Sequence, residues 1–418
     1  MIFQFSGRGG GGPGFSLFSF RSPFFVSSHF FPPGSSLGIV GGGQLGRMLA
    51  REARRKGYRV VVFTDEYPPS PAGQLATREI NAAYYDPEAL SSFVQDVDVV
   101  TMEFENIPAP FLAALEQRKP VFPSRQALET TQNREREKTF LRQHGLPCAD
   151  FRVVDSSESL AAAVAALGTP CVLKTAAFGY DGKGQVRLDK AEACWDDVWR
   201  AFGAARGVVE AWIDFACEIS VVAARGQDGV FVPFSCVENQ HSHHILDVTI
   251  APARVAPAVA AEAARLARAV AEALDYVGVL AVEMFVLRDG RVLINEVAPR
   301  PHNSGHYTID ACVTNQFEQQ LRAVTGLPLG DPAQHTAAVM VNLLGDVWPG
   351  ETESPDWTPV LRHPRAKLHL YGKRRALPKR KMGHFTVLGA TATQALVEAL
   401  AIKAELLAQK SRVAVLPD

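Results

Sequence analysis

Two glutamates in the second half of the chain lie on segments that the sequence predicts to pair as a β-hairpin. The apolar run 279–287, which contains Glu283, is typical of a buried strand. Residues 291–296, which end on Glu296, are typical of the strand that returns beside it. Between the two strands, Asp289-Gly290 is a strong signal for a two-residue turn.

The predicted register brings the two acidic side chains together. A two-residue turn pairs Arg288 with Arg291, and counting outward from this pair places Glu283 directly opposite Glu296. Like charges at opposite positions destabilise a sheet, and the apolar flanks cannot solvate them. A hard cation such as Mg²⁺ would relieve the repulsion, because it binds carboxylate oxygens readily. The alternative is an exposed hairpin whose acidic side chains face water.

A glycine-rich loop between two predicted strands is a second candidate site. Lys174 lies on the apolar strand 172–175, the loop spans 176–185, and residues 186–188 return as a strand. Backbone N–H groups of such a loop can approach phosphate oxygens, and a neighbouring lysine neutralises their charge. A flexible hairpin tip is the alternative. A nucleoside triphosphate would explain both sites, since it brings phosphates for the loop and Mg²⁺ for the glutamates.

A third motif matches a dinucleotide-binding fingerprint. GGGQLG at 41–46 follows a predicted strand and opens a predicted helix, and Asp65 lies about twenty residues further on. An NAD(P)-dependent oxidoreductase is therefore one hypothesis. Gln44 and Arg47, however, add side chains to a turn that a pyrophosphate normally contacts through the backbone. A simple phosphate ester at the helix N-terminus is the interpretation that we favour.

Composition limits the classes of protein that need to be considered. The 418 residues are enough for two or three domains, and the net charge of −1 gives no general argument for binding nucleic acid or a membrane. No apolar run approaches the length of a membrane-spanning helix. The six cysteines include no CxxC pair and are typical of buried thiols in a reducing compartment. We therefore expect a cytoplasmic protein.

Four regions follow one another along the chain. Residues 1–36 contain no acidic residue and are rich in Gly, Ser and Phe, which is typical of a disordered or targeting-like extension. Organellar targeting by this segment stays open, and we exclude the segment from the fold. Alternating strands and helices at 37–132 predict a parallel Rossmann-like domain. Residues 133–327 mix helices with antiparallel strands, and 328–418 predict a small β-rich domain that ends in a helix.

Three strand candidates in the middle region are predicted to form a meander. They lie at 208–213, 217–224 and 229–236, with glycine or acidic turns between them.

The motifs together resemble the ATP-grasp superfamily and, within it, the 5-(carboxyamino)imidazole ribonucleotide synthases of purine biosynthesis. The resemblance extends from about Leu37 to Leu388. It rests on GGGQLGRM (41–48), TMEFENIP (101–108), GYDGKGQ (179–185), NEVAPRPHNSGH (295–306) and YGK…KRKMGH (371–384). It implies a mixed α/β and α+β fold of ATP-grasp architecture, with an N-terminal Rossmann-like (pre-ATP-grasp) domain and a small C-terminal domain. It also implies a homodimer.

The resemblance implies an ATP-dependent carbon–nitrogen ligase. Such an enzyme joins bicarbonate to 5-aminoimidazole ribonucleotide through carboxyphosphate, and it releases ADP and phosphate. Mg²⁺ is the implied metal, with Mn²⁺ as an alternative, and neither nucleic acid nor a membrane is an implied partner.

The resemblance also implies the residues of the site. The ATP-binding set would be Arg134, Lys138, Lys174, Gly179, Tyr180, Asp181, Gly182, Lys183, Gly184, Gln185, Glu210, Ala211, Trp212, Ile213, Glu218, His241, Asn295 and Glu296. The magnesium ligands would be Glu283 and Glu296. The catalytic set on the bicarbonate side would be Arg300, His302, Asn303 and Lys373. The ribonucleotide would contact Gln44, Leu45, Glu103, Tyr180, Asp181, Lys373, Arg380 and Lys381.

Two of these assignments raise structural questions. In a regular hairpin Asn295 and Glu296 point to opposite faces, so a nucleotide contact by Asn295 needs a bulge or a backbone role. The six Lys and Arg residues between 371 and 384 could instead form a nucleic-acid patch. A single 5′-phosphate needs only a few of them, and a solvated basic face would explain Arg374 and Arg375.

Three alternative functions stay open. Another ATP-grasp ligase, such as formate-dependent glycinamide ribonucleotide transformylase, would share the ATP residues and differ at 299–306 and 371–384. The oxidoreductase depends on the first glycine motif alone. A non-catalytic ribonucleotide-binding protein is disfavoured by Glu283, Glu296 and Lys174.

Overall fold

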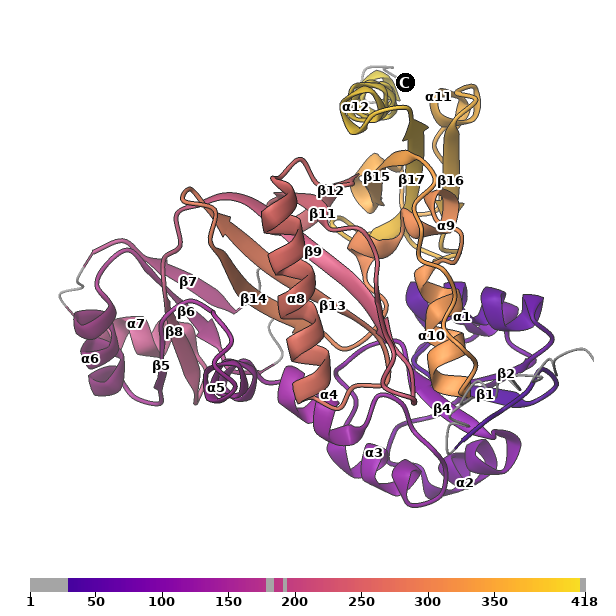
Figure 1. The fold of residues 1–418 in the computed structure, drawn as a ribbon, viewed down its shortest axis with the longest axis horizontal. Coiled ribbons are helices and arrows are strands. Elements are labelled where there is room, and N and C mark those ends of the chain that lie inside the picture. Colours follow the sequence, from indigo (N-terminus) through magenta and orange to yellow (C-terminus); the bar gives the residue numbers. More distant parts are fainter. Residues whose placement is uncertain (1–28, 178–183, 191–193, 414–418) are drawn as a thin grey trace, which may run out of the picture.

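The computed structural model describes residues 29–177, 184–190 and 194–413, which form three units around a central cavity (Figure 1). Most of the predicted N-terminal extension lies outside the described residues, but its last residues belong to the fold. Phe31 packs against the N-terminal core, and its N–H donates to the carbonyl of Thr325 at 2.9 Å. The boundary that we predicted at residue 37 was therefore too late.

The N-terminal unit is a parallel sheet of four strands in the order β3-β2-β1-β4, with helices on both faces. Its strands are β1 (Ser36–Val40), β2 (Arg59–Thr64), β3 (Arg78–Asn81) and β4 (Val99–Met102). Helices α1 (Gln44–Arg55), α2 (Pro87–Asp96) and α3 (Ala109–Glu116) pack on it. Strand β1 is buried along its whole length, as a doubly covered parallel strand should be. The sequence did not predict β3, because Ile80 is its single apolar residue.

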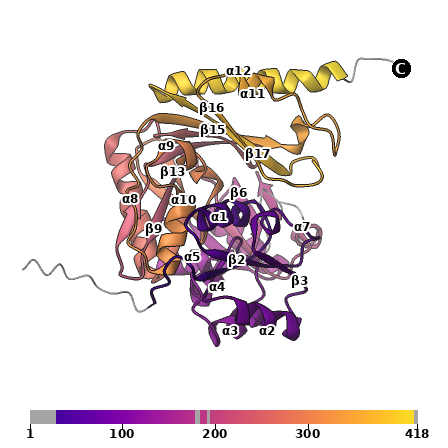
Figure 2. The same cartoon turned by 90° about the vertical axis from the view of Figure 1, so that its right-hand side faces the viewer.

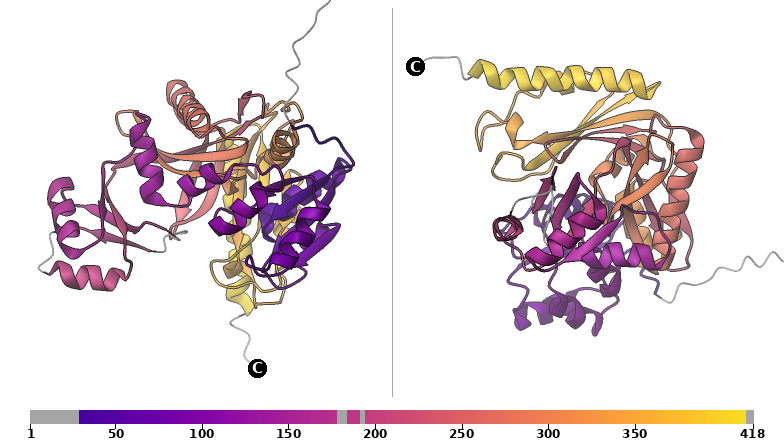
Figure 3. Two further views of the ribbon diagram at one scale, coloured as in Figure 1. Left: turned by 90° about the horizontal axis from the view of Figure 1, so that it is seen from below. Right: turned by 90° about the vertical axis from the view of Figure 1, so that its left-hand side faces the viewer.

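The second unit is a small antiparallel sheet in the order β5-β8-β6-β7. It comprises β5 (Phe151–Val154), β6 (Cys171–Thr175), β7 (Gln185–Leu188) and β8 (Gly207–Ala211), covered by α6 (Ser157–Leu167) and α7 (Trp195–Phe202). Figure 3 shows this unit standing apart from the N-terminal unit. The predicted meander is wrong in its first strand, because β8 pairs with β5 and β6 and not with the strand that follows it. Closeness in sequence suggested the wrong partner.

A sheet of nine strands forms the third unit. Its order is β14-β13-β9-β11-β12-β15-β17-β16, and β10 pairs with β9. The strands are β9 (Phe215–Arg225), β10 (Phe231–Pro233), β11 (Val237–Ser242), β12 (Ile245–Ala251), β13 (Gly278–Leu287), β14 (Val292–Ala298), β15 (Ala337–Leu344), β16 (Ala366–Leu370) and β17 (Lys381–Gly389). Strands β12 and β15 pair directly, so the predicted C-terminal region continues the sheet of the middle region.

Helices on the large sheet complete the cores. Helix α8 (Pro257–Ala273) packs on β9 and β13, and α12 (Ala392–Val413) lies across β15 and β17 (Figure 2). Helices α4 (Arg125–Thr131), α5 (Arg134–Gln143) and α10 (Gln316–Thr325) connect the units. Among the residues that the structure describes, no helix combines the length and the apolar character needed to span a bilayer.

Three histidines meet where the C-terminal strands contact the short helix α9 (Thr308–Ala311). The rings of His369 and His384 stack with centroids 4.5 Å apart, and the ring of His306 lies 4.8 Å from that of His384. His369 is paired with Asp310 at 2.7 Å. Burial lowers the pKa of His306 to about 3 and holds the pKa of His384 well below its usual range. The folded protein therefore keeps both buried imidazoles neutral.

This burial predicts a loss of stability in acid that a single substitution can isolate. Below pH 6.5 His306 binds a proton in the unfolded protein but stays unprotonated in the folded protein. The contribution of His306 to the free energy of unfolding therefore falls as pH drops toward 3. The wild-type free energy of unfolding, minus that of His306→Asn, should therefore fall by up to about 1.4 kcal/mol per pH unit below pH 6.5. Urea unfolding of both proteins between pH 7.5 and 4.5 measures this difference in the free energy of unfolding. The same comparison for the exposed His335→Asn should stay flat, and a flat result for His306→Asn would contradict the assignment.

Candidate active site

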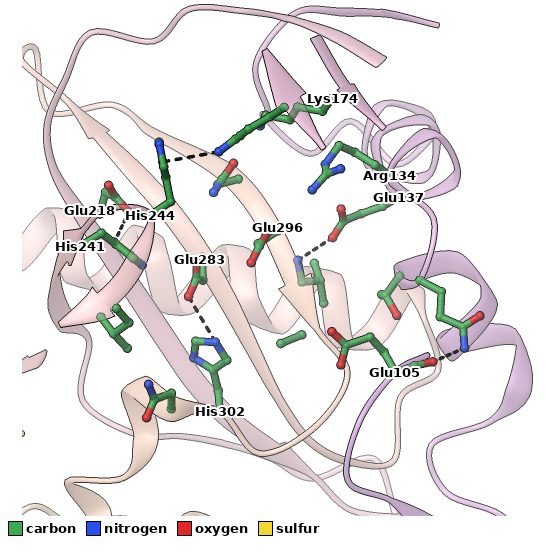
Figure 4. A pocket seen from close by; sticks show the side chains of 18 of the residues that line it. Glu105, Arg134, Glu137, Lys174, Glu218, His241, His244, Glu283, Glu296 and His302 are labelled. Carbon is green, nitrogen blue, oxygen red and sulfur yellow. Dashed lines mark hydrogen bonds and ion pairs between the residues drawn. The ribbon is translucent and has the colours of Figure 1, made fainter. Parts of the chain in front are cut away.

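A cavity of about 1120 Å³ lies between the three units, and all of them contribute to its walls (Figure 4). The predicted site residues that line it are Gln44, Leu45, Glu103, Arg134, Lys174, Gln185, Glu210, Ala211, Trp212, Ile213, Glu218, His241, Glu283, Asn295, Glu296, Arg300, His302, Asn303, Lys373, Arg380 and Lys381. Lys138 and Gly184 are absent from the lining. The predicted loop residues Gly179, Tyr180, Asp181, Gly182 and Lys183 lie outside the described residues. The fold thus gathers nearly the whole described set into one place.

Glu283 and Glu296 face each other as predicted, although the predicted turn is wrong. The N–H of Leu287 donates to the carbonyl of Arg291 at 2.8 Å, so the connection has three residues, and it ends on Gly290 with φ +87°. Val286 consequently pairs with Val292, one residue out of the predicted register. A second irregularity restores that register before the glutamates.

The second irregularity is a β-bulge at Asn295. Met284 pairs with Ile294, whereas Glu283 pairs with Glu296, so Asn295 has no partner across the ladder. Its carbonyl accepts a hydrogen bond of 2.8 Å from the ammonium of Lys138. A nucleotide contact by Asn295 needed a bulge or a backbone role, and the bulge is present, whereas the carbonyl of Asn295 bonds to Lys138. The extra residue of the bulge offsets the extra residue of the turn, which is why the predicted glutamate pairing is correct.

Lys138 lies behind the cavity wall, where we had expected a phosphate contact. Its side chain is 1% exposed, and its ammonium lies 3.3 Å from Glu210, on the small sheet. The other carboxylate oxygen of Glu210 lies 3.1 Å from the ammonium of Lys174. Burial alone would raise the pKa of Glu210, but the two lysines lower it to about 2. Lys138 is thus neutralised by protein groups, whereas Arg134, Lys174 and Arg187 are cations of this wall that line the cavity.

Glu283 lies in an environment that resists its ionisation. Burial, and after it the charge of Glu296, holds the pKa of Glu283 far above its usual range. Glu137 on α5 is a third acid here, which the sequence did not predict; burial raises its pKa to about 8. Its carboxylate accepts the N–H of Val297 at 2.5 Å, which keeps it beside Glu296. A glutamate in the charged run REREK looks like a solvated helix residue, so the sequence offers no signal for it.

Arg300 is paired with a protein carboxylate, although we expected its guanidinium to bind bicarbonate. Its Nε and Nη2 lie 2.5 and 3.1 Å from the two oxygens of Glu105, which follows β4 in the N-terminal unit. Burial would raise the pKa of Glu105, but Arg300 lowers it. A contact to bicarbonate therefore cannot use this edge of the guanidinium. The second N–H of Nη2 and the N–H groups of Nη1, which lies 3.4 Å from the carbonyl of Pro301, are left for a ligand.

The first glycine motif holds a protein carboxylate of its own. Gly43 and Gly46 donate their N–H groups to Glu103, with 2.8 Å from Gly46 to its Oε2. A Cβ on Gly43 would lie 2.4 Å from a carboxylate oxygen of Glu103, so the approach depends on glycine. A phosphate at these amides would have to displace the buried Glu103. This corrects both the dinucleotide hypothesis and the phosphate position that we favoured, whereas Gln44 and Leu45 line the cavity beside the motif.

A basic corner faces Glu103 from the C-terminal region. Lys373, Arg380 and Lys381 line the cavity there. Burial, and after it the charge of Arg380, lowers the pKa of Lys373 to about 8.

The neighbouring arginines point elsewhere. Arg374 donates to the carbonyl of Pro68 and lies over the ring of Tyr67, and Arg375 pairs with Glu351. Both are exposed and neither lines the cavity, as the solvated-face alternative predicted.

The opposite end of the cavity carries the hinge between the small and the large sheet, residues 211–213, which belong to the predicted ATP-binding set. Ala211, Trp212 and Ile213 line it as the chain passes from the small sheet to the large one. The carboxylate of Glu218 lies 2.8 Å from Nδ1 of His241. Burial would lower the pKa of His241, but Glu218 raises it.

Comparison with known proteins places the chain among enzymes of one activity. Family models match as the ribonucleotide synthetase preATP-grasp domain at 35–132, the ATP-grasp domain at 139–317 and the phosphoribosylaminoimidazole carboxylase C-terminal domain at 338–398. The N5-carboxyaminoimidazole ribonucleotide synthase of Brucella melitensis is 45% identical over 357 residues, which cover 85% of this chain and 96% of that protein. The enzyme of the same name from Bacillus subtilis is 43% identical over 363 residues, 87% of this chain and 94% of its own.

Solved structures agree with the sequence relatives. An ADP complex of N5-carboxyaminoimidazole ribonucleotide synthetase is 41% identical with a TM-score of 0.84, and the match covers 92% of this chain and 100% of that one. The N5-carboxyaminoimidazole synthase of Aspergillus clavatus, in complex with ADP and 5-aminoimidazole ribonucleotide, is 32% identical with a TM-score of 0.79. That match covers 90% of this chain and 99% of that one.

Because Glu283 faces a second carboxylate, we predict that removing its charge stabilises the metal-free protein. The folded pKa of Glu283 lies above its unfolded value of 4.5, so its ionisation costs stability as pH rises above 4.5 toward the folded pKa. Glu283→Gln cannot ionise, so in EDTA it should be more stable than the wild type at pH 8, and the gain should shrink toward pH 4.5. Urea unfolding in EDTA measures this, with the exposed Glu272→Gln as a control that should show no such gain. If Glu283→Gln were no more stable than the wild type at pH 8 in EDTA, the interpretation would be wrong.

Proposed function

The chain belongs to the N5-carboxyaminoimidazole ribonucleotide synthase family, and from this premise we propose how its cavity performs the family's reaction. The protein is an ATP-grasp ligase that carboxylates 5-aminoimidazole ribonucleotide in purine biosynthesis. The observation that carries the proposal is the pair of facing glutamates in a cavity that is cationic on both sides. The proposal assigns ATP to the side of the small sheet and the ribonucleotide to the side of the C-terminal region.

Glu283 and Glu296 are the proposed magnesium ligands, and the residues fit that ion. Both carboxylates line the cavity, Glu283 is buried, and its repulsion by Glu296 favours a positive charge between them. Among the described residues there is no group of three or more His, Cys, Asp or Glu side chains arranged to hold a metal ion. Mg²⁺ suits this arrangement, because it takes one or two carboxylates and fills its remaining positions with phosphate oxygens and water. When bound, it would neutralise charge on the phosphoryl group of ATP.

Protein cations and the hinge would hold ATP. Arg134 and Lys174 would contact the phosphates, since these two cations line the cavity beside the small sheet. The backbone at 211–213 would recognise adenine, and Glu218 would bind the ribose hydroxyls. Lys138 would act indirectly, because its charge compensates Glu210 and its hydrogen bond to Asn295 shapes the bulge beside the metal ligands.

Bicarbonate would bind beside the carboxylate pair, at Arg300, His302 and Asn303. Asn303 supports this placement, because its side-chain nitrogen and oxygen are buried and have no hydrogen-bond partner among the described residues. Buried polar groups are rarely left unsatisfied, so an unpartnered amide that lines a cavity points to a ligand. Bicarbonate is a poor electrophile, and transfer of the γ-phosphoryl group of ATP to its oxygen gives carboxyphosphate and ADP. The protein's part is to position the two anions and compensate their charge.

The ribonucleotide would occupy the corner between Glu103 and the C-terminal cations. Lys373, Arg380 and Lys381 would bind its 5′-phosphate, since they line the cavity as a basic group. Its amine would then face the bicarbonate side. Carboxyphosphate breaks down to phosphate and carbon dioxide. The amine attacks the carbon to form the new C–N bond, one C=O bond of carbon dioxide becomes the C–O⁻ of the new carboxylate, and the amine proton passes to the released phosphate. Enclosure of the cavity would keep water from competing for the intermediate.

The homodimer and the cytoplasmic location stay predictions. Sedimentation of the purified protein tests the first, and localisation of the full-length chain, residues 1–28 included, tests the second.

Substrate selectivity gives a direct test of the function. Phosphate release from ATP in bicarbonate buffer should be stimulated at least tenfold by 5-aminoimidazole ribonucleotide, because the amine consumes carboxyphosphate. Glycinamide ribonucleotide with formate should give no stimulation. A coupled phosphate assay measures both, and NADH binding by fluorescence tests the oxidoreductase. Stimulation by glycinamide ribonucleotide instead would favour the transformylase, and no stimulation by either would refute the proposal.

The metal assignment predicts that either carboxylate is indispensable. Glu283→Gln and Glu296→Gln should each lower kcat by at least about 100-fold, as expected when charge stabilisation of a transition state is lost. The coupled assay at saturating Mg²⁺ measures this, and circular dichroism checks the fold. Glu272→Gln, on the exposed face of α8, should leave kcat unchanged. Wild-type turnover in either cavity variant would overturn the assignment.

A further inference from the structure

A chain of buried hydrogen bonds runs through the large sheet to His302. Thr249 on β12 donates to Asn239 on β11 at 3.1 Å, and the amide nitrogen of Asn239 donates to Ser220 on β9 at 2.9 Å. Ser220 donates to the hydroxyl of Ser304 at 2.8 Å, and that hydroxyl lies 2.9 Å from Nδ1 of His302. The four other members of this hydrogen-bond chain are each at most 4% exposed, and none of them lines the cavity.

The direction of this buried hydrogen-bond chain is determined at its end. The backbone N–H of Ser304 also points at Nδ1 of His302, at 3.3 Å. A backbone N–H can only donate, so Nδ1 must be an acceptor and cannot carry a proton. A neutral imidazole then carries its proton on Nε2. That nitrogen lies 3.3 Å from Oε1 of Glu283, and a carboxylate is the acceptor that an N–H requires (Figure 4).

Gln316 fixes the backbone of His302. Its side-chain oxygen accepts the N–H of His302 at 2.8 Å, and its side-chain nitrogen donates to the carbonyl of His302 at 2.8 Å. Gln316 is fully buried. A Cβ on Gly305 would lie 2.5 Å from its oxygen, so this contact needs a glycine there. Backbone and ring of His302 are thus both oriented by groups outside the cavity.

Burying this many polar groups is costly unless each is satisfied, and apolar side chains would fill the sheet interior at least as stably. We infer that Ser220, Asn239 and Ser304 are positioning residues that hold His302 as a fixed Nε2–H donor toward Glu283 and the bicarbonate side. His302 then donates a hydrogen bond during carboxylation and does not accept a proton from a substrate. Its bond to one oxygen of Glu283 leaves the other oxygen for the cation, as partners of metal ligands commonly do. The inference rests on the proposed function for its catalytic part and on geometry alone for the tautomer.

Substitutions at His302 separate a donor from a base. The amide nitrogen of glutamine can take the place of Nε2–H, whereas the shorter asparagine reaches only the position of Nδ1. His302→Gln should therefore keep kcat within about tenfold of the wild type, and His302→Asn should lose at least about 100-fold, in the range of a removed transition-state hydrogen bond. Equal loss in both variants would overturn the donor role.

A double-mutant cycle tests whether the serines act through His302. Ser220→Ala and Ser304→Ala should each lower kcat several-fold without changing the KM for ATP, and neither should lower kcat further in a His302→Ala background. Thr325→Val removes a buried hydroxyl that donates to the carbonyl of Leu321 and does not line the cavity, and it should leave kcat unchanged. Additive losses in the His302→Ala background would mean that the serines act through the fold, and would refute their role.

The tautomer can be observed without turnover. In protein labelled with ¹⁵N-histidine, two-bond ¹H–¹⁵N spectra at pH 7.5 should show His302 protonated at Nε2 and unprotonated at Nδ1. The resonance is assigned by its absence in His302→Gln. A proton on Nδ1, or on both nitrogens, would refute the inference. This measurement needs no substrate, so it stands even if the ribonucleotide fails to stimulate ATP cleavage and the proposed function itself falls.

Discussion

The site depends on two carboxylates that the backbone forces to face each other. Strand pairing sets Glu283 opposite Glu296, and the burial of Glu283 keeps water from solvating its charge. A sheet would normally avoid this pair, because like charges at opposite positions cost stability. The bulge at Asn295 makes it unavoidable, since a regular ladder after a three-residue turn would place Glu296 out of register with Glu283. The neighbouring groups follow from this constraint: His302 donates toward Glu283, and Lys138 secures the bulge through the carbonyl of Asn295.

The N-terminal unit contributes carboxylates to the site, although its fold is one that commonly binds phosphate. Glu103 fills the amides of the glycine turn, and Glu105 occupies one edge of Arg300. Glu103 thereby removes an anion site that the glycine motif had suggested, and Glu105 limits an anion at Arg300 to the other side of the guanidinium. What remains for anions is the free side of Arg300, the unpartnered amide of Asn303 and the cations of the C-terminal region. The carboxylates of one unit thus determine which cations of another unit are open to a substrate.

Local rules predicted much of this, and long-range pairing limited the rest. Counting outward from the turn predicted that Glu283 and Glu296 would meet, which the structure confirms. Strand alternation showed that a nucleotide contact by Asn295 would need a bulge or a backbone role, and the structure has a bulge there. Turn length was wrong by one residue, because Asp-Gly serves two-residue turns and three-residue turns that end on glycine. The sequence did not predict three features for one shared reason: the buried Glu137, the pairing of Arg300 with Glu105, and the sheet to which β8 belongs. Each is decided by a contact between segments far apart in sequence, and no local pattern distinguishes a buried glutamate from a solvated one.

The charges around the cavity explain why the resemblance to known enzymes extends to chemistry and not only to fold. Buried acids with raised pKa values and the buried His302, whose pKa is lowered, store a cost that an uncharged core would not incur. Stability alone gives no reason to keep them. A reaction between ATP and a ribonucleotide does, because the phosphates of the two substrates can only approach one another where positive charge is fixed in advance and water is excluded. Fixed acids hold those cations in place before the substrates arrive, and a neutral His302 can lie among them without adding to the repulsion.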